Sequence, residues 1–116
     1  MSCSTTLIES VFIGRDNEID LVISNVNTDA GIDFISYGVT KMEVYVEGLM
    51  VSSEDGYITY QDGGRVNMRL GHVVGLTTNR TYPITLIAYD PLHTSGQVLI
   101  SQGMSSSKVA IRAYTV

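Results

Sequence analysis

The sequence predicts an all-β protein built from two packed antiparallel sheets. Apolar and polar residues alternate in short runs bounded by Gly, Asn, Asp and Ser, and helical periodicity is nearly absent. These runs recur about every ten residues with no segment suited to a crossover helix, which favours a sandwich over an α/β fold. A chain of 116 residues is the usual size of one domain. We therefore expect residues 7–116 to form one sandwich domain, with residues 1–6 as a flexible N-terminal arm.

Composition and charge exclude several classes of function. Seven basic and twelve acidic residues give a net charge of −5, and the scattered basic residues form no stripe of the kind that binds nucleic acid. No window approaches the roughly 18 apolar residues of a membrane helix, and the N-terminus lacks the features of a secretion signal. The single cysteine, Cys3, has no partner for a disulfide. We expect a protein that is made in a reducing cytoplasm and binds neither nucleic acid nor membrane.

The first third of the chain predicts a hairpin followed by a polar loop. The run Thr6 to Ile13 ends in a turn at residues 14–17, and the next run places three apolar residues on one face: Ile19, Leu21 and Ile23. Residues 25–38 form the longest polar stretch. Within it we expect three apolar residues to tuck back into the core or to form a short edge strand: Ile32, Phe34 and Ile35.

The middle of the chain holds the clearest strand patterns. A half-buried strand starts at Val39 and points three residues inward: Met42, Val44 and Val46. A short run at residues 49–51 follows, and residues 52–56 form a turn. Residues 57–61 and 65–70 then form a hairpin around Asp62-Gly63-Gly64, whose glycines allow the positive φ of a tight turn. In its second strand we expect three residues to face the core: Val66, Met68 and Leu70.

The last third contains a spacing typical of a tyrosine corner. Leu76 stands six residues before Tyr82, which opens a long strand. In immunoglobulin-like sandwiches such a tyrosine sends its hydroxyl back to the upstream backbone, although an ordinary tyrosine at a strand start would give the same spacing. Pro83 indicates an edge strand or a strand that has just begun. After a turn at Asp90-Pro91, residues 97–101 and 108–115 form the last strands, and the second points three residues inward: Val109, Ile111 and Ala113.

These elements together predict an immunoglobulin-like antiparallel β-sandwich of about seven to nine strands. A small jelly roll or partly open barrel is the alternative, because strand order cannot be read from the sequence.

No arrangement of residues predicts catalysis. The only imidazoles are His72 and His93, and a pair between Asp90 and His93 comes without a Gly-x-Ser-x-Gly nucleophile elbow. The Gly63-Gly64 pair leads into a strand, whereas a phosphate-binding loop leads into a helix. We therefore expect no enzymatic activity and no cofactor.

Metal binding also lacks a complete ligand set. One cysteine and two distant histidines exclude a zinc site of the usual spacing. Residues 16–20 and 25–29 carry oxygen ligands at alternate positions, as at the start of a calcium loop. The second stretch has Ala30 where that loop needs glycine and Ser36 where it needs glutamate. We expect these residues to form turns and to bind no metal.

Tyrosines are the remaining candidates for binding. The chain has seven, with two Phe and no Trp, and four of them fall in predicted strands, where some must face outward: Tyr45, Tyr57, Tyr60 and Tyr89. Outward tyrosines suit protein interfaces, because they bury a large area and keep a hydroxyl available. They also suit stacking on sugars. Cross-strand packing on a solvated sheet face is the alternative.

Two stretches of the chain, YITYQDGGRVNMRLG at residues 57–71 and YPITLIAYDPLHTSGQVL at residues 82–99, resemble small proteins from the structural-gene modules of tailed bacteriophages. The resemblance covers residues 39–113 and rests on turn and strand patterns. It implies an immunoglobulin-like sandwich that serves as a capsid decoration or cement protein, or as a neck, tail or baseplate component. It carries over no catalytic residues.

Cement proteins bridge capsid subunits, so the resemblance implies a location in the virion, partners among the major capsid or other virion proteins, and a homo-oligomer on the particle. We expect the contacts to come from Tyr57, Tyr60 and Arg65 in the hairpin and from the Asp90–Gly96 loop with His93. A glycan-binding adhesion module displayed on a phage or cell surface is the alternative, using outward tyrosines and a calcium loop.

Overall fold

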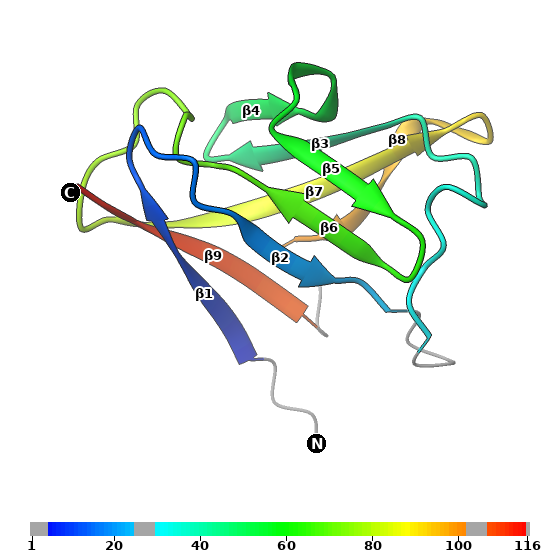
Figure 1. Ribbon diagram of the computed structural model, residues 1–116, viewed down its shortest axis with the longest axis horizontal. Coiled ribbons are helices and arrows are strands. Elements are labelled where there is room, and N and C mark those ends of the chain that lie inside the picture. The colour runs from blue at the N-terminus through cyan, green and yellow to red at the C-terminus, as the bar shows by residue number, and fades with distance from the viewer. Residues whose placement is uncertain (1–4, 25–29, 102–106, 116) are drawn as a thin grey trace.

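The structure, a computed structural model, describes residues 5–24, 30–101 and 107–115 of the chain (Figure 1). These residues form nine strands, one 3₁₀ helix (η1) and no α-helix. The elements are β1 (Thr5–Phe12), β2 (Ile19–Val22), β3 (Lys41–Val46), β4 (Leu49–Ser52), η1 (Ser53–Asp55), β5 (Ile58–Gln61), β6 (Arg65–Met68), β7 (Thr81–Asp90), β8 (His93–Ile100) and β9 (Ser107–Tyr114).

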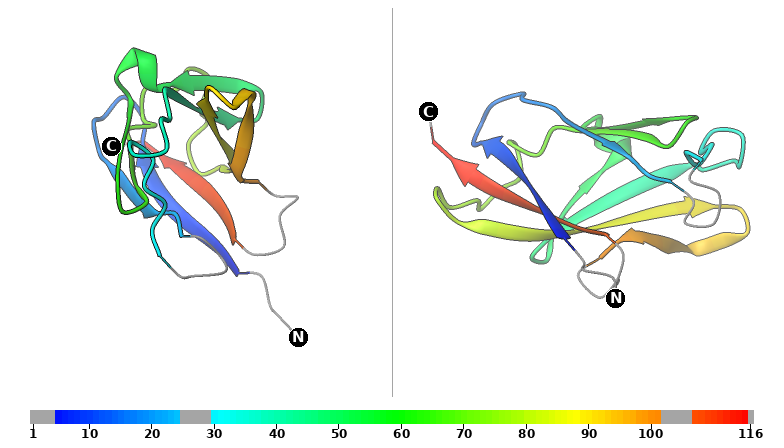
Figure 2. Two further views of the ribbon diagram at one scale, coloured as in Figure 1. Left: turned by 90° about the vertical axis from the view of Figure 1, so that its right-hand side faces the viewer. Right: turned by 90° about the horizontal axis from the view of Figure 1, so that it is seen from below.

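The strands form two packed sheets, and Figure 2 shows the two layers from the side. The larger sheet has the order β1-β9-β7-β3-β4, with β8 also paired to β7, and the smaller sheet has the order β2-β6-β5. Strands β9, β7, β3 and β4 thus take the G, F, C and C′ places of an immunoglobulin variable-type domain, and β2, β6 and β5 take the B, E and D places. The predicted immunoglobulin-like β-sandwich is confirmed.

One sheet contact departs from the antiparallel prediction. β1 pairs in parallel with β9, from Thr5 opposite Ser107 to Phe12 opposite Tyr114. The predicted hairpin between the first two strands is therefore wrong, because β1 and β2 lie in different sheets. Their connection is anchored elsewhere, since the Gly14 N–H donates to the Gly71 carbonyl at 2.8 Å. The chain consequently crosses between the sheets.

The core between the sheets follows the predicted alternation. The inward positions of β3, β6 and β9 are buried, and Leu86 at the centre of β7 is fully buried. The predicted inward residues that are buried are Ile19, Leu21, Met42, Val44, Val46, Val66, Met68, Leu70, Val109, Ile111 and Ala113. In the polar stretch Phe34 is buried and Ile35 is exposed, so the predicted tucking holds for Phe34 and is wrong for Ile35.

β7 organises the larger sheet. β3 lies along one of its edges. Along its other edge, residues 81–83 pair with β9 and residues 86–90 pair with β8. β8 and β9 therefore lie one after the other along the same edge of β7, and the chain leaves the sheet between them. The predicted Asp90–Gly96 loop is wrong, because β8 already begins at His93 and only residues 91–92 turn the chain.

The predicted tyrosine corner is present at the start of β7. Tyr82 is buried, and its hydroxyl accepts a hydrogen bond from the Thr77 N–H at 2.7 Å. Leu76 packs half-buried against the core beside this turn. The corner ties the β6–β7 connection to the larger sheet, as it does in immunoglobulin-like domains.

The β5–β6 turn is clasped to residues 31–36. The Asp62 carboxylate accepts hydrogen bonds from the N–H groups of Ile35 (2.8 Å) and Ser36 (3.1 Å) and from the Ser36 hydroxyl (2.7 Å). In return, Asp33 accepts from the Gly63 N–H at 2.9 Å. These bonds fix the turn of the β5–β6 hairpin against residues 31–36.

Candidate functional site

The outer face of the larger sheet carries a cluster of tyrosine and apolar side chains. Register places Tyr45 beside Met50 and Ile87 beside Val98, on the strand face opposite the buried core residues. Met50 and Val98 are both 48% exposed, whereas Tyr45, Ile87 and Tyr89 are half-buried. We call this surface the tyrosine face and define it as Tyr45, Met50, Ile87, Tyr89 and Val98.

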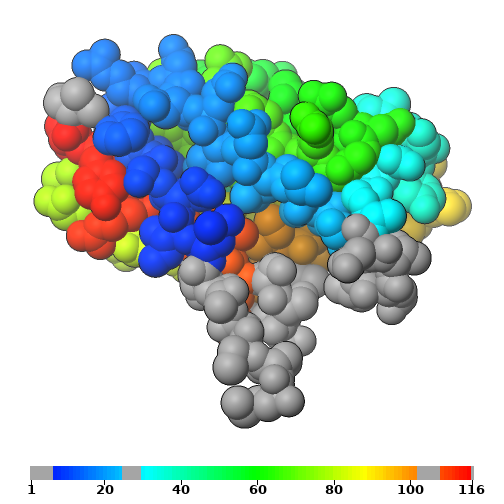
Figure 3. Space-filling model, turned by 60° about the horizontal axis from the view of Figure 1, so that its bottom comes forward, coloured from blue at the N-terminus to red at the C-terminus, as the bar shows by residue number. Residues whose placement is uncertain are grey.

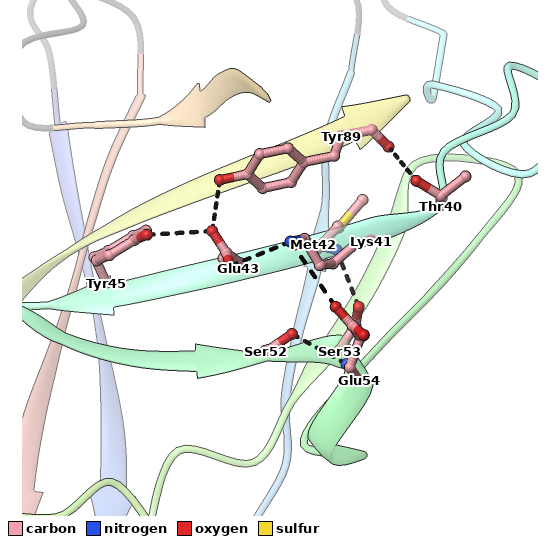
Figure 4. Close-up of polar contacts among 9 residues, drawn as sticks. All are labelled: Thr40, Lys41, Met42, Glu43, Tyr45, Ser52, Ser53, Glu54 and Tyr89. Atoms are coloured by element: carbon pink, nitrogen blue, oxygen red, sulfur yellow. Dashed lines mark hydrogen bonds and ion pairs between the residues drawn. The ribbon is translucent and has the colours of Figure 1, made fainter. Parts of the chain in front are cut away.

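A buried carboxylate organises the tyrosine face from beneath (Figure 4). Glu43 in β3 is only 8% exposed although its side chain lies on the outer side of the sheet. Its Oε1 accepts hydrogen bonds from the hydroxyls of Tyr89 (2.5 Å) and Tyr45 (3.2 Å). The carboxylate thus fixes the orientation of two aromatic rings that come from neighbouring strands.

Lys41 completes this network. Its ammonium lies 3.6 Å from the Glu43 carboxylate, 3.8 Å from that of Glu54, and 4.4 Å from the centre of the Tyr89 ring. Next to it, the Ser53 hydroxyl accepts a hydrogen bond from the Met42 N–H at 3.0 Å. The start of η1 is thereby joined to β3, so the network connects β3 to η1 as well as to β7.

The protonation equilibria reflect these contacts. Hydrogen bonds from Tyr89 and then Tyr45, together with the Lys41 charge, outweigh burial and lower the pKa of Glu43. The same Glu43 hydrogen bond, with burial, raises the pKa of Tyr89 to about 12. The cluster therefore holds one carboxylate and two neutral phenols at neutral pH. It holds an acceptor and two donors in fixed positions.

The sequence could not reveal the role of Glu43. Strict alternation marks it as a solvent-facing residue, and the neighbours on the same face that the sequence shows are Lys41 and Tyr45, two residues before and after it. Tyr89 reaches Glu43 only through the β3–β7 register, in which Glu43 lies opposite Ile87.

Tyr57 and Tyr60, predicted as contact residues, lie in different surroundings. Tyr57 is half-buried, and its ring stacks on His72 with centres 5.4 Å apart. The Tyr60 hydroxyl donates to the Val39 carbonyl at 3.1 Å, and its ring meets Phe34 edge-on at 6.3 Å. Tyr60 therefore faces the core side of β5, and its prediction as an outward contact is corrected.

Arg65 and His93 lie on different surfaces. Arg65 is exposed at the start of β6, on a shallow surface of the smaller sheet that also contains Asp20 and Gln61. His93 begins β8, where its Nδ1 lies 2.9 Å from Asp90 Oδ1. Burial raises the pKa of Asp90, but hydrogen bonds from His93 and Leu92 outweigh it and lower the pKa. The predicted contact residues thus form no single patch.

A cleft of about 490 Å³ opens beside the β7–β8 hairpin. Its walls are mostly apolar and include the exposed side chains of Tyr37 and Leu92, with Asp90 and His93 as polar groups. The described contacts of the His93 ring go to Asp90, and in the described part of the chain none joins it to a hydroxyl. Within the described residues, the Asp90–His93 pair therefore has the orienting carboxylate of a catalytic dyad but no hydroxyl bonded to the imidazole.

Metal-binding arrangements are not found among residues 5–24, 30–101 and 107–115, where no three His, Cys, Asp or Glu side chains converge. Two carboxylates of the first suspected calcium stretch are engaged otherwise: Asp16 bonds His72 at 2.6 Å and Asp20 accepts from Asn67 at 2.6 Å. The second stretch, residues 25–29, lies outside the described residues.

The protein is an immunoglobulin-like β-sandwich whose larger sheet carries the tyrosine face on its outer side. No protein-family model and no curated protein matches the chain. Within the described residues, no helix is long and apolar enough to cross a membrane.

Proposed function

We propose that this protein is a non-enzymatic structural component of a tailed-bacteriophage virion, a capsid decoration or cement protein that attaches through its tyrosine face. A neck, tail or baseplate position is a variant of the same role. The phage assignment rests on the resemblance of residues 39–113. The attachment surface rests on one observation, the buried Glu43 that holds Tyr45 and Tyr89 in place.

Pre-organisation makes this surface suitable for binding. A side chain that is already held in its bound orientation loses little conformational entropy when a partner covers it. Tyrosines are among the residues that contribute most to interfaces, and the flanking Met50 and Val98 supply apolar area at the rim. The acidic net charge of −5 favours a partner surface that carries basic groups.

The test is attachment to particles of the phage that encodes the protein. Heads that lack the protein are mixed with the purified chain, sedimented, and quantified for bound protein. We expect Met50→Lys with Val98→Lys to reduce binding at least tenfold, because two charges would be buried at the interface. Val22→Lys, at a position in β2 of the smaller sheet that is 65% exposed, is the matched control and should bind as the wild type does. Unchanged binding by the double variant would refute the assigned surface.

Glycan binding is the second candidate, and the cleft beside the β7–β8 hairpin favours it. An exposed tyrosine, Tyr37, and the polar pair Asp90 and His93 are groups that can stack on a sugar ring and bond its hydroxyls. A glycan array probed with the wild type and with Tyr37→Ala separates the two candidates. Specific binding that is lost in the variant would favour glycan recognition, and an array without signal would favour the virion role.

A further inference from the structure

We propose that β1 is an interaction edge that pairs with β1 of a second copy of this chain, antiparallel and about a two-fold axis. The larger sheets of the two copies would then form one continuous sheet. This inference goes beyond the proposed virion role and does not depend on it.

β1 is an open edge of the larger sheet. In the strand order it is bonded to β9 alone, and its other side ends the sheet. The surface view in Figure 3 shows β1 in dark blue, uncovered beside the red of β9. Among the described residues, one backbone bond uses this side of β1, at its C-terminal end, where the Arg15 N–H donates to the Phe12 carbonyl at 3.0 Å. Residues 5–11 therefore present a row of backbone groups that only another strand can pair regularly.

This edge has few of the features that keep sheet edges from pairing. Proteins protect edges with charged side chains, proline, bulges or very short strands. β1 is 8 residues long, contains no proline and a single charged residue, Glu9, and keeps an uninterrupted register with β9. The other edges are protected: β2, β4 and β5 have 4 residues each, and β8 carries two register shifts. β1 is thus the one edge in the described part of the chain that is both long and regular.

The start of β1 is also poorly covered. β9 pairs with β7 only as far as Ala110, which lies opposite Ile8 of β1. Before Ile8, β1 and β9 form a ribbon of two strands, and such ribbons are marginally stable alone. Leu7 and Ile8 point to opposite faces of this ribbon and are 48% and 56% exposed. β1 of a second copy would cover both residues. Together with the β9 strands of the two copies, it would give a sheet of four strands.

The sequence of β1 fits a second copy of itself. In an antiparallel pair about a two-fold axis, one residue lies opposite its own copy. A centre at Glu9 would place two carboxylates opposite each other, which is destabilising. A centre at Ile8 places Ile8 against Ile8 and Leu7 against Glu9, and it pairs residues 5–11. A centre at Leu7 pairs only residues 5–9. Ile8 is therefore the centre that gives the longest ladder without a clash of charges, and two-fold closure limits the assembly to a dimer.

The first experiment measures the mass of the full chain by light scattering on a sizing column over a dilution series. The wild type should give about twice the 12.6 kDa chain mass, falling toward one chain on dilution. Ile8→Lys should give the monomer throughout, because a lysine at the centre opposes its own copy. Leu92→Lys, at a residue that is 90% exposed on the β7–β8 turn, should dimerise as the wild type does. A monomeric wild type, or a dimer that Ile8→Lys leaves intact, would overturn the proposal.

A second experiment tests the register. In a Cys3→Ser background, Ile8→Cys should form a covalent dimer under mild oxidation, since directly opposed residues bring their Cβ atoms within about 5 Å. Leu92→Cys in the same background should crosslink at only the slow rate of random collision. Equal rates at the two positions would overturn the two-fold centre at Ile8. Particle attachment by Ile8→Lys, measured separately, shows whether the virion role stands independently of dimerisation.

Discussion

At the scale of single residues, the tyrosine face depends on one carboxylate. Glu43 is buried on the outer side of a sheet because two phenol hydroxyls and an ammonium replace the water it loses. The three partners come from positions 41, 45 and 89, so the arrangement requires the β3–β7 register. A substitution of Glu43 should therefore change the pKa of Tyr89.

Replacing Glu43 with Gln should lower the pKa of Tyr89 from about 12 toward its usual value of 10.0, because the charged acceptor that stabilises the neutral phenol is gone. A spectrophotometric titration of tyrosinate compares the wild type and E43Q, with Tyr89→Phe to assign the transition. An unshifted Tyr89 transition in E43Q would contradict the network in Figure 4.

A second residue-scale prediction concerns the tyrosine corner. Tyr82→Phe removes the hydroxyl that accepts the Thr77 N–H and leaves the ring in the core. We expect the unfolding temperature to fall by a few degrees with the fold retained. Tyr37→Phe, at a residue that is 73% exposed, provides the control and should leave the unfolding temperature unchanged. Equal unfolding temperatures for Tyr82→Phe and the wild type would show that the corner contributes nothing.

At the scale of elements, alternation predicted strands well and their partners poorly. The inward residues of β3, β6 and β9 follow from period-2 patterning, because a one-residue slip would expose the whole apolar set. The partner of β1 could not be predicted, since the same two runs and the same turn residues between them are compatible with a hairpin and with a crossover between the sheets. His93 was expected in a loop for a similar reason: the polar run Thr94 to Gly96 gives no strand pattern, and it lies at a register shift of β8 between the paired residues His93 and Gln97.

The candidate site was predicted only in part. Some of the four tyrosines in strands were expected to face outward, and Tyr45 and Tyr89 do so at the tyrosine face. Tyr60 was expected as an outward contact of the β5–β6 hairpin, but it has the same parity as the buried Ile58 and faces the core side of β5. Glu43 carried no signal, because contacts across strands are set by register and not by neighbouring sequence.

The clasp between the β5–β6 turn and residues 31–36 gives an element-scale prediction. A Cβ at Gly31 would lie 2.1 Å from the Gly63 carbonyl oxygen, so Gly31→Ala should cost about 3 kcal/mol or more and separate the two segments. Gly14→Ala is the control, because its Cβ would meet no atom within 4 Å and only the positive φ of 77° opposes it, at about 1–2 kcal/mol. Urea unfolding measures both. A smaller loss for Gly31→Ala than for Gly14→Ala would contradict the close approach.

At the scale of the whole molecule, four carboxylates in the described part of the chain have lowered pKa values in the folded state: Asp16, Glu43, Asp62 and Asp90. A group with a depressed folded pKa stabilises the fold fully above its unfolded pKa, here 3.8 for Asp and 4.5 for Glu. That stabilisation is lost as the pH falls through the folded pKa.

The protein should therefore lose stability below about pH 4.5 and keep it between there and neutrality. Unfolding by urea across this range measures the slope. Asp62→Asn should flatten the acid limb, because one proton fewer is taken up on unfolding. A stability that rises on acidification from pH 4.5 would contradict the assigned carboxylate contacts.

At the same scale, the two proposed surfaces do not overlap, so binding through one leaves the other accessible. The tyrosine face covers β3, β4, β7 and β8, and the proposed dimer edge is β1 at the opposite end of the strand order. A dimer joined through β1 would present two tyrosine faces and could bridge two neighbouring sites on a particle. Bridging of this kind raises avidity without any new contact.

The central claim, that this domain attaches to virions through its tyrosine face, is tested most directly by sedimenting it with heads of the phage that encodes it. We predict saturable binding at a fixed number of copies per head for the wild type, and loss of binding when Met50 and Val98 are both replaced by lysine. Saturable binding by the wild type and the double variant alike would contradict the assigned face, and no binding by the folded wild type would contradict the virion role.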